Sequence, residues 1–210
     1  MASPVGRFFL AVLILLPLSF GAWYYMAIVI TWPLTYLVDL VMTGLFPQAI
    51  SAIEQQGYTL DVVTRFAPPS ASGLPPGRVG EVVFELNPLV YGYGLPLYTA
   101  LVLATPGKEG AKWGSWILGM LVLFPMQAWG VCFDILKTLL FGLGPEIGGQ
   151  LGFAQWQIEA VALGYQFGSL ILPAVTPVVL WIAFHRSYLA TLVPGFAGRF
   201  AASGNGHNRG

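Results

Sequence analysis

The residues best suited to nucleophilic chemistry are the single cysteine, Cys132, and a histidine, His185. A cysteine thiolate attacks a carbonyl when a histidine within hydrogen-bond reach takes its proton, as in cysteine-dependent transpeptidases. Cys132 lies near the predicted outer end of one apolar segment, and His185 lies at the predicted inner end of the next. At 1.5 Å per helical residue the two are about 20 Å or more apart. We therefore expect no catalytic residue, with Cys132 as a packing residue, and keep a Cys-dependent membrane transpeptidase as an alternative.

Three ionisable residues, Asp134, Lys137 and Glu159, lie near the predicted membrane segments. Charged groups are costly in lipid, so they are candidates for function. Asp134 and Lys137 are three residues apart and can pair on one helical face. With Asn87 these residues form a predicted outer polar patch. The patch either anchors helix ends at the membrane interface or belongs to a solute pathway, which leaves a small transporter or channel as a second alternative.

Motifs for metals, nucleotides and phosphate are absent from the sequence. The second histidine, His207, lies in the tail, and no cluster of His, Cys or carboxylates has the spacing of metal ligands. We therefore expect no cofactor and no metal site. The formal net charge is +0, which gives no electrostatic reason to expect a nucleic-acid partner.

The composition is that of a membrane protein. Hydrophobic residues make up 56% of the chain and charged residues 9%, whereas a soluble domain has about 25% charged residues. The mean hydropathy is +0.73. A soluble fold cannot bury this much apolar surface, so the lipid bilayer must be the solvent for much of the chain.

The apolar runs predict an all-α protein with four transmembrane helices. The spans are expected at about 8–32, 89–105, 113–140 and 157–184 within one membrane domain of residues 1–200, followed by a disordered tail at 201–210. The first span is expected to remain uncleaved. The span at 89–105 is short and contains Gly92, Gly94 and Pro96, so we expect an irregular outer part and a central place in the bundle.

Basic residues near the span ends predict that both termini are cytoplasmic. With that orientation the inner side carries six basic residues, which are Arg7, Lys108, Lys112, Arg186, Arg199 and Arg209. The outer side carries three, which are Arg65, Arg78 and Lys137. This topology places residues 33–87 outside the cytoplasm as an insertion between the first two spans.

The insertion is expected to begin with an amphipathic helix. Apolar residues recur at helical spacing from Leu34 to Leu45, and Thr35, Asp39 and Thr43 form a polar stripe. A second short amphipathic helical piece is expected to end near Gln56. The helix is interpreted as a surface-seated scaffold, with a groove for a partner as the alternative.

A β-hairpin is expected to follow the helix. The segments Thr59–Phe66 and Glu81–Asn87 alternate between apolar and polar residues, and the Pro- and Gly-rich stretch 67–80 joins them as a loop. A lone two-stranded hairpin is marginal in water. Its apolar face must therefore rest on the outer helix, on the membrane surface or on another protein. As a partner-binding face we predict Leu60, Val62, Phe66, Val82, Phe84 and Leu86.

Several stretches resemble the exosortase H-associated membrane proteins. They are Arg7-Phe8-Phe9-Leu10, Leu15-Leu16-Pro17-Leu18, the stretch from Asn87 to Pro96, Leu172-Pro173 and Phe184-His185-Arg186. The resemblance implies an accessory protein of the bacterial inner membrane that serves a sorting system. Such a system cleaves proteins at a C-terminal signal made of a short motif, a membrane helix and a basic end. The resemblance carries over no catalytic residue.

The sequence thus predicts a non-enzymatic accessory membrane protein. Its expected role is to dock an exosortase-type sorting enzyme or the substrates that carry its C-terminal signal. Its expected partners are the lipid bilayer and a membrane-embedded sorting enzyme or its substrates.

Overall fold

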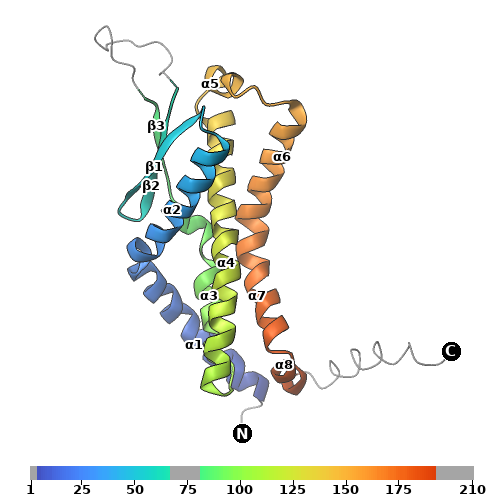
Figure 1. Ribbon diagram of the computed structural model, residues 1–210. Helices are drawn as coiled ribbons and strands as arrows, with labels where there is room; N and C mark the ends of the chain where they lie inside the picture. Colours follow the sequence, from blue (N-terminus) through green and yellow to red (C-terminus); the bar gives the residue numbers. More distant parts are fainter. Residues whose placement is uncertain (1–3, 67–80, 193–210) are drawn as a thin grey trace, which may run out of the picture.

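The computed structural model describes residues 4–66 and 81–192 (Figure 1). The predicted loop at 67–80 and the predicted tail at 201–210 lie outside these residues. The longer helices are α1 (Pro4–Tyr25), α2 (Ala27–Leu45), α3 (Gly94–Ala104), α4 (Glu109–Lys137), α6 (Gln155–Gln166) and α7 (Leu172–Phe184). Two short helices are α5 (Pro145–Gln150) and α8 (Arg186–Leu192), and the strands are β1 (Ile50–Gln56), β2 (Thr59–Thr64) and β3 (Val83–Leu86). A 3₁₀ turn covers Pro88–Tyr91, and π-helical turns cover Thr138–Gly142 and Phe167–Ile171.

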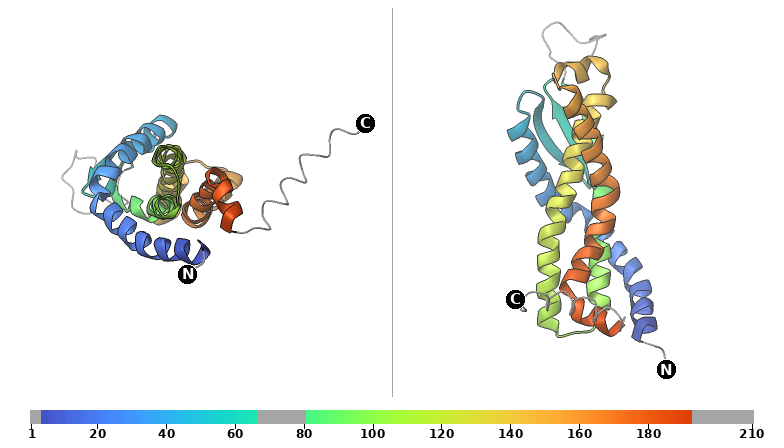
Figure 2. Two further views of the ribbon diagram at one scale, coloured as in Figure 1. Left: turned by 90° about the horizontal axis from the view of Figure 1, so that it is seen from below. Right: turned by 90° about the vertical axis from the view of Figure 1, so that its right-hand side faces the viewer.

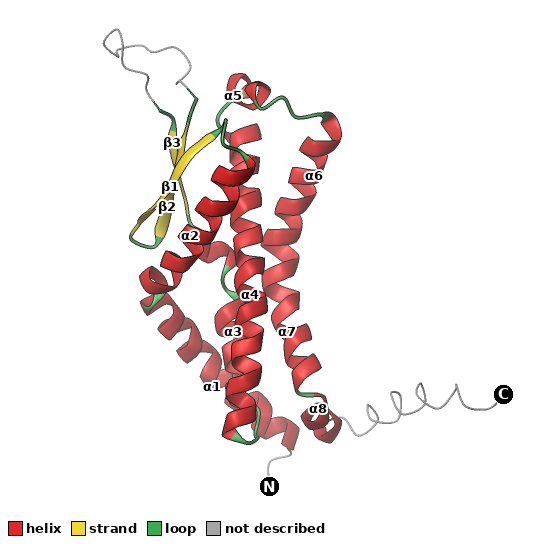
Figure 3. Ribbon diagram, viewed as in Figure 1, coloured by secondary structure: helices red, strands yellow, loops and turns green. Residues whose placement is uncertain are grey.

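The helices form an elongated bundle with the sheet at one end. Helix α4 runs along the long axis, the continuous α6–α7 segment lies beside it, and the strands gather in the upper half (Figure 3). The start of α1, the turn between α3 and α4, and α8 all lie at the lower end (Figure 1). Arg7, Lys108, Lys112 and Arg186 are therefore at the same end of the molecule. That this end faces the cytoplasm stays a prediction.

Within residues 4–66 and 81–192, four helical segments are long and apolar enough to cross a membrane, which is the number predicted. They are Pro4–Tyr25, Ala27–Leu45, Glu109–Gly142 and Gln155–Phe184. The set differs from the prediction, because the run 8–32 is divided between α1 and α2 at Met26. Met26 has φ −89° and ψ 6°, which is outside the α-helical range.

Helix α3 replaces most of the predicted span at 89–105. It has 11 residues, or about 16 Å at 1.5 Å per residue, and is shorter than a hydrocarbon core of about 30 Å. The expected irregular outer part is the 3₁₀ turn Pro88–Tyr91, which Asn87 caps through its side chain. Helix α3 packs against α1, α4 and α7, and Tyr98 and Ala100 are fully buried. The predicted central position is therefore confirmed.

The sheet has three strands in the order β1-β2-β3. The predicted hairpin is confirmed, since β2 and β3 pair antiparallel with Leu60 opposite Leu86 and Val62 opposite Phe84. The predicted second helical piece is wrong, because Ile50–Gln56 forms β1 and pairs with β2. The backbone N–H of Ile53 also donates a hydrogen bond of 2.9 Å to the Asp39 carboxylate on α2. Strand pairing and this bond hold the segment extended.

Two apolar clusters form the core. The upper one joins the inner faces of the sheet and α2 to α4, and it includes the fully buried Leu34, Val38 and Leu60. The lower one joins α1, α3, α4 and α7 around Tyr98 and Trp181. Helix α4 contributes to both clusters, which connects the sheet to the lower bundle.

Candidate functional site

The structure keeps the candidate nucleophile and base apart. His185 follows α7 at the lower end, where its Nδ1 lies 3.1 Å from the Trp181 carbonyl and its Nε2 3.4 Å from Ser115 Oγ. Cys132 lies 17 residues beyond Ser115 on the same helix, which is about 25 Å. A nucleophile and its base need hydrogen-bond contact, so these two residues cannot cooperate in this fold.

The predicted polar patch divides into one ion pair and two separate groups. Lys137 Nζ lies 2.7 Å from Asp134 Oδ1 and 4.3 Å from the centre of the Tyr165 ring. Glu159 accepts a hydrogen bond from Gln155 on its own helix. Asn87 accepts one from the Leu89 N–H. The structure therefore brings Asp134 and Lys137 together and gives Glu159 and Asn87 local partners.

The apolar face of the hairpin rests on the chain's own helices. Leu60 and Val62 are 0% exposed, and Phe66 and Leu86 are also buried. All four belong to the core that α2 and α4 complete. Val82 and Phe84 pack against the same core but remain partly accessible. Of the six residues predicted to bind a partner, only these two present surface to one, and such a contact stays a prediction.

A lateral groove that the sequence pattern did not reveal lies below the sheet, in the lower half of the bundle. It opens between α1, α3 and α4 and has a volume of about 780 Å³. Seen from below, α1 and α2 curve around one side of the bundle, α4 stands in its middle and the α6–α7 segment lies on the opposite side (Figure 2). The lining residues are Leu15, Leu18, Ser19, Ala22, Trp23, Met26, Ile30, Leu95, Pro96, Thr99, Leu103, Trp116, Ile117, Met120, Leu121, Phe124 and Pro125.

The groove arises from the way the helices pack. Helix α1 packs on α3, and α3 packs on α4. Because α3 has only 11 residues, it separates the two longer helices without filling the space between them. Groove residues such as Leu18, Ile117 and Leu121 are more than half exposed within the chain. The groove is therefore an apolar surface that the described part of the chain leaves uncovered.

Polar atoms in the groove are few and mostly satisfied. Thr99 Oγ1 donates to the Leu95 carbonyl at 2.8 Å and accepts from Trp116 Nε1 at 3.1 Å. Trp23 Nε1 is buried and has no partner among the described residues. A buried indole N–H usually finds a hydrogen-bond partner. The Trp23 donor is therefore unpaired among the described residues and enclosed by the chain's own atoms, not presented to the groove.

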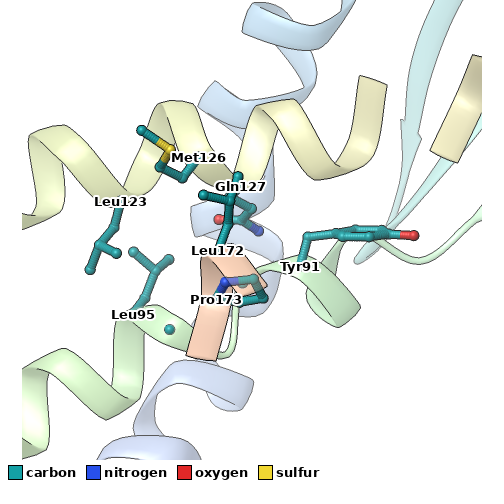
Figure 4. A pocket seen from close by; sticks show the side chains of 9 residues that line it. Tyr91, Leu95, Leu123, Met126, Gln127, Leu172 and Pro173 are labelled. Carbon is teal, nitrogen blue, oxygen red and sulfur yellow. The ribbon is translucent and has the colours of Figure 1, made fainter. Parts of the chain in front are cut away.

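A small cavity lies behind the same region (Figure 4). It has a volume of about 10 Å³, which is the space that one water molecule needs. Gln127 lines it, donates from Nε2 to the Pro88 carbonyl at 3.3 Å, and leaves its buried Oε1 without a partner. A Cβ at Gly92 would lie 2.6 Å from Gln127 Nε2 and 3.2 Å from Trp23 Cζ2. The glycine thus allows Gln127 and Trp23 to contact the same backbone segment.

Residues 4–66 and 81–192 offer no candidate metal site. These residues contain no group of three or more His, Cys, Asp or Glu side chains that could hold a metal ion. The groove is therefore an apolar surface with few polar groups.

Comparison with known proteins identifies the family. The family model described as exosortase H-associated membrane protein matches residues 2–188. The chain belongs to this family. The groove, the sheet and the Asp134–Lys137 pair all lie in the part of the chain that the family model matches. Neither the curated proteins nor the solved structures include a match. Together with the four apolar helices among the described residues, the family description makes this a multi-pass membrane protein of the exosortase H-associated family.

Proposed function

We propose that this protein is a non-enzymatic accessory protein of the bacterial cytoplasmic (inner) membrane. Its role is to dock an exosortase-type sorting enzyme or the substrates that carry the C-terminal signal. The observation that supports the proposal is the lateral groove of about 780 Å³, which is apolar and unfilled by the described helices. Such a surface suits a partner that lies in the same bilayer.

The physical basis for docking in the membrane is packing. Lipid tails are as apolar as leucine, so helices associate in a bilayer through close van der Waals contact and hydrogen bonds. Small side chains at the contact favour close approach, and Ser19 and Ala22 supply them on the α1 wall.

We infer a position for the bilayer from the basic lower end of the molecule and the rise along α4. With the basic lower end at the cytoplasmic surface, Gly130 lies about 32 Å above Glu109 along the helix. A hydrocarbon core of about 30 Å then ends near the bend at Met26 and the Pro88–Tyr91 turn. In this placement the groove lies inside the core, whereas α2, the sheet and the Asp134–Lys137 pair lie beyond it on the outer side, so α2 does not cross the core despite its length and apolar composition.

A deletion experiment in the native bacterium tests the role. Removal of this protein should reduce processing of proteins that carry the exosortase signal, and the wild-type chain should restore it. The variant Cys132→Ala should restore processing equally, because Cys132 lies about 25 Å along α4 from Ser115, the residue that His185 contacts. Unchanged processing in the deletion strain would contradict the proposal, and failure of Cys132→Ala alone would favour the transpeptidase alternative.

A further inference from the structure

We propose that a pocket at the lower end of the bundle binds the phosphate group of an anionic phospholipid. The pocket lies between the start of α1, the turn that joins α3 to α4, and α8, which meet at this end (Figure 1). It has a volume of about 330 Å³. This binding is separate from the docking role and does not depend on it. The lining residues are Pro4, Arg7, Phe8, Ala104, Pro106 and Tyr188.

Two side chains of the pocket carry free hydrogen-bond donors. Arg7 is exposed and belongs to neither of the ion pairs formed among residues 4–66 and 81–192. The Tyr188 ring packs against Phe8 with 5.7 Å between ring centres, and its hydroxyl has no hydrogen-bond partner within the described ranges. A guanidinium presents a planar fork of N–H donors that matches two phosphate oxygens, and a phenol can donate to a third. Both donors are therefore available to a phosphate.

The pocket is fixed by the packing beneath it. Phe8 is 7% exposed and stacks on Trp181 with 5.3 Å between ring centres. Trp181 Nε1 donates a hydrogen bond of 2.8 Å to Thr105 Oγ1, where α3 ends. These contacts tie α1 and α7 to the turn after α3. The wall that carries Arg7 is therefore held in place relative to the wall that carries Pro106.

The charge of the lower end favours an anion. Arg7, Lys108, Lys112 and Arg186 all lie there, and in the described part of the chain Glu109 is the one acidic residue beside them. Glu109 lies 3.9 Å from Lys112, which leaves the other basic side chains uncompensated. Clusters of basic residues at a membrane surface attract anionic lipids. A zwitterionic headgroup would bring its own ammonium group toward the same cations, so we expect selection for an anionic headgroup.

The surroundings of the pocket favour a lipid over a free anion. Trp113, at the base of α4, is half exposed, as is typical of tryptophan at the level of lipid headgroups. Farther along α1, Phe9, Leu10 and Leu13 are each more than half exposed. They offer acyl chains an apolar face beside the Arg7 guanidinium. A phospholipid meets both the charge and the apolar surface, whereas a free phosphate meets only the charge.

Lipid binding to the full chain tests the site. Native mass spectrometry from detergent measures the affinity for phosphatidylglycerol and, separately, for phosphatidylethanolamine. We expect one phosphatidylglycerol to bind more tightly than phosphatidylethanolamine. Arg7→Gln should weaken its binding about tenfold and Tyr188→Phe about threefold, through the loss of hydrogen bonds to the phosphate. Arg186→Gln removes the same charge at the same end but outside the pocket lining, and should weaken binding by less than about twofold.

A second variant at the same position guards against misfolding. Arg7→Lys keeps the charge and removes the planar fork, so its affinity should lie between those of wild type and Arg7→Gln. Each variant must elute as wild type on size exclusion, and Arg7→Lys carries the test if Arg7→Gln does not.

Three results would overturn the site. Equal losses in Arg7→Gln and Arg186→Gln would show a diffuse attraction to the whole basic end. Equal affinity for the two lipids would exclude an anionic headgroup as the ligand. Binding of inorganic phosphate that requires Arg7 and displaces phosphatidylglycerol would make a free anion the ligand. All three leave the docking role untouched, because exosortase-dependent processing is measured separately.

Discussion

The backbone N–H of Ile53 on β1 donates a hydrogen bond of 2.9 Å to the carboxylate of Asp39 on α2. The bond satisfies a donor on the outer edge of the sheet, where an unpaired strand would otherwise be open to pairing with another chain. It also fixes the sheet against the helix that buries its apolar face. Asp39 therefore stabilises the upper half of the molecule.

Replacement of Asp39 tests this relationship. Asp39→Ala should lower the free energy of unfolding by about 1.5–3 kcal/mol, because a hydrogen bond to a charged group is lost. Glu54→Ala, on the exposed face of the same strand, should change stability by less than about 0.5 kcal/mol. Denaturant unfolding in detergent measures both, and equal values for the two variants would contradict the assigned role.

The exposed face of the sheet carries three carboxylates in one row. Glu54 lies opposite Asp61 in the β1–β2 pairing, and Asp61 lies opposite Glu85 in the β2–β3 pairing. Like charges directly opposite one another destabilise a sheet. Asp61→Asn should therefore raise the melting temperature at low salt, with a gain of about 0.5 kcal/mol that shrinks as salt is added. A loss of stability at low salt would show that the row is stabilised by a group outside this pairing.

Close packing of α3 on α4 depends on Gly119. A Cβ at this position would lie 2.1 Å from Tyr98 Cε1, whereas a Cβ at Gly114 meets nothing within 4 Å among the described residues. Gly119→Ala should destabilise the protein by about 1–3 kcal/mol through overpacking. Gly114→Ala, on the same helix, should be neutral or stabilising by up to about 1 kcal/mol because alanine favours the helix. Thermal unfolding of the pair in one detergent is the measurement, and similar losses in both would contradict this packing.

Acid should weaken the fold at its lower end through His185. Burial lowers the pKa of the His185 imidazole below 6.5, and the nearby Lys112 charge acts in the same direction, while the hydrogen bond to the Trp181 carbonyl opposes them. The unfolded chain therefore binds a proton near pH 6.5, before the folded chain does. Stability should be full above this pH and should fall as the pH drops below it. His185→Gln should remove this part of the pH dependence, as unfolding measured between about pH 5 and pH 7.5 will show.

The sequence predicts those features that depend on local pattern. Period-two alternation from Leu60 to Phe66 identified β2 and its buried face, and the spacing of Cys132 and His185 along helices correctly kept them apart. The segment Ile50–Gln56 has no such alternation, and it is a strand because β2 pairs with it and Asp39 binds Ile53. These contacts come from elsewhere in the chain, so no local signal reveals them.

The sequence did not predict the bend between α1 and α2 or the groove, for related reasons. No proline or glycine lies within three residues of Met26, so nothing local marks the division of α1 from α2. The groove depends on how a short α3 separates α1 from α4, which is a property of helix arrangement. Trp23, which lines the groove, is in the sequence only one of seven tryptophans.

Filling the groove tests the central claim most directly. Ala22 lines the groove and is exposed within the chain, so Ala22→Trp should occupy the space without disturbing the core. Co-purification of the exosortase with this variant should fall about tenfold, equivalent to about 1.4 kcal/mol of lost binding, while Leu13→Trp on the same helix retains wild-type recovery. Both variants must elute as wild type on size exclusion. Full recovery with Ala22→Trp would contradict docking in the groove.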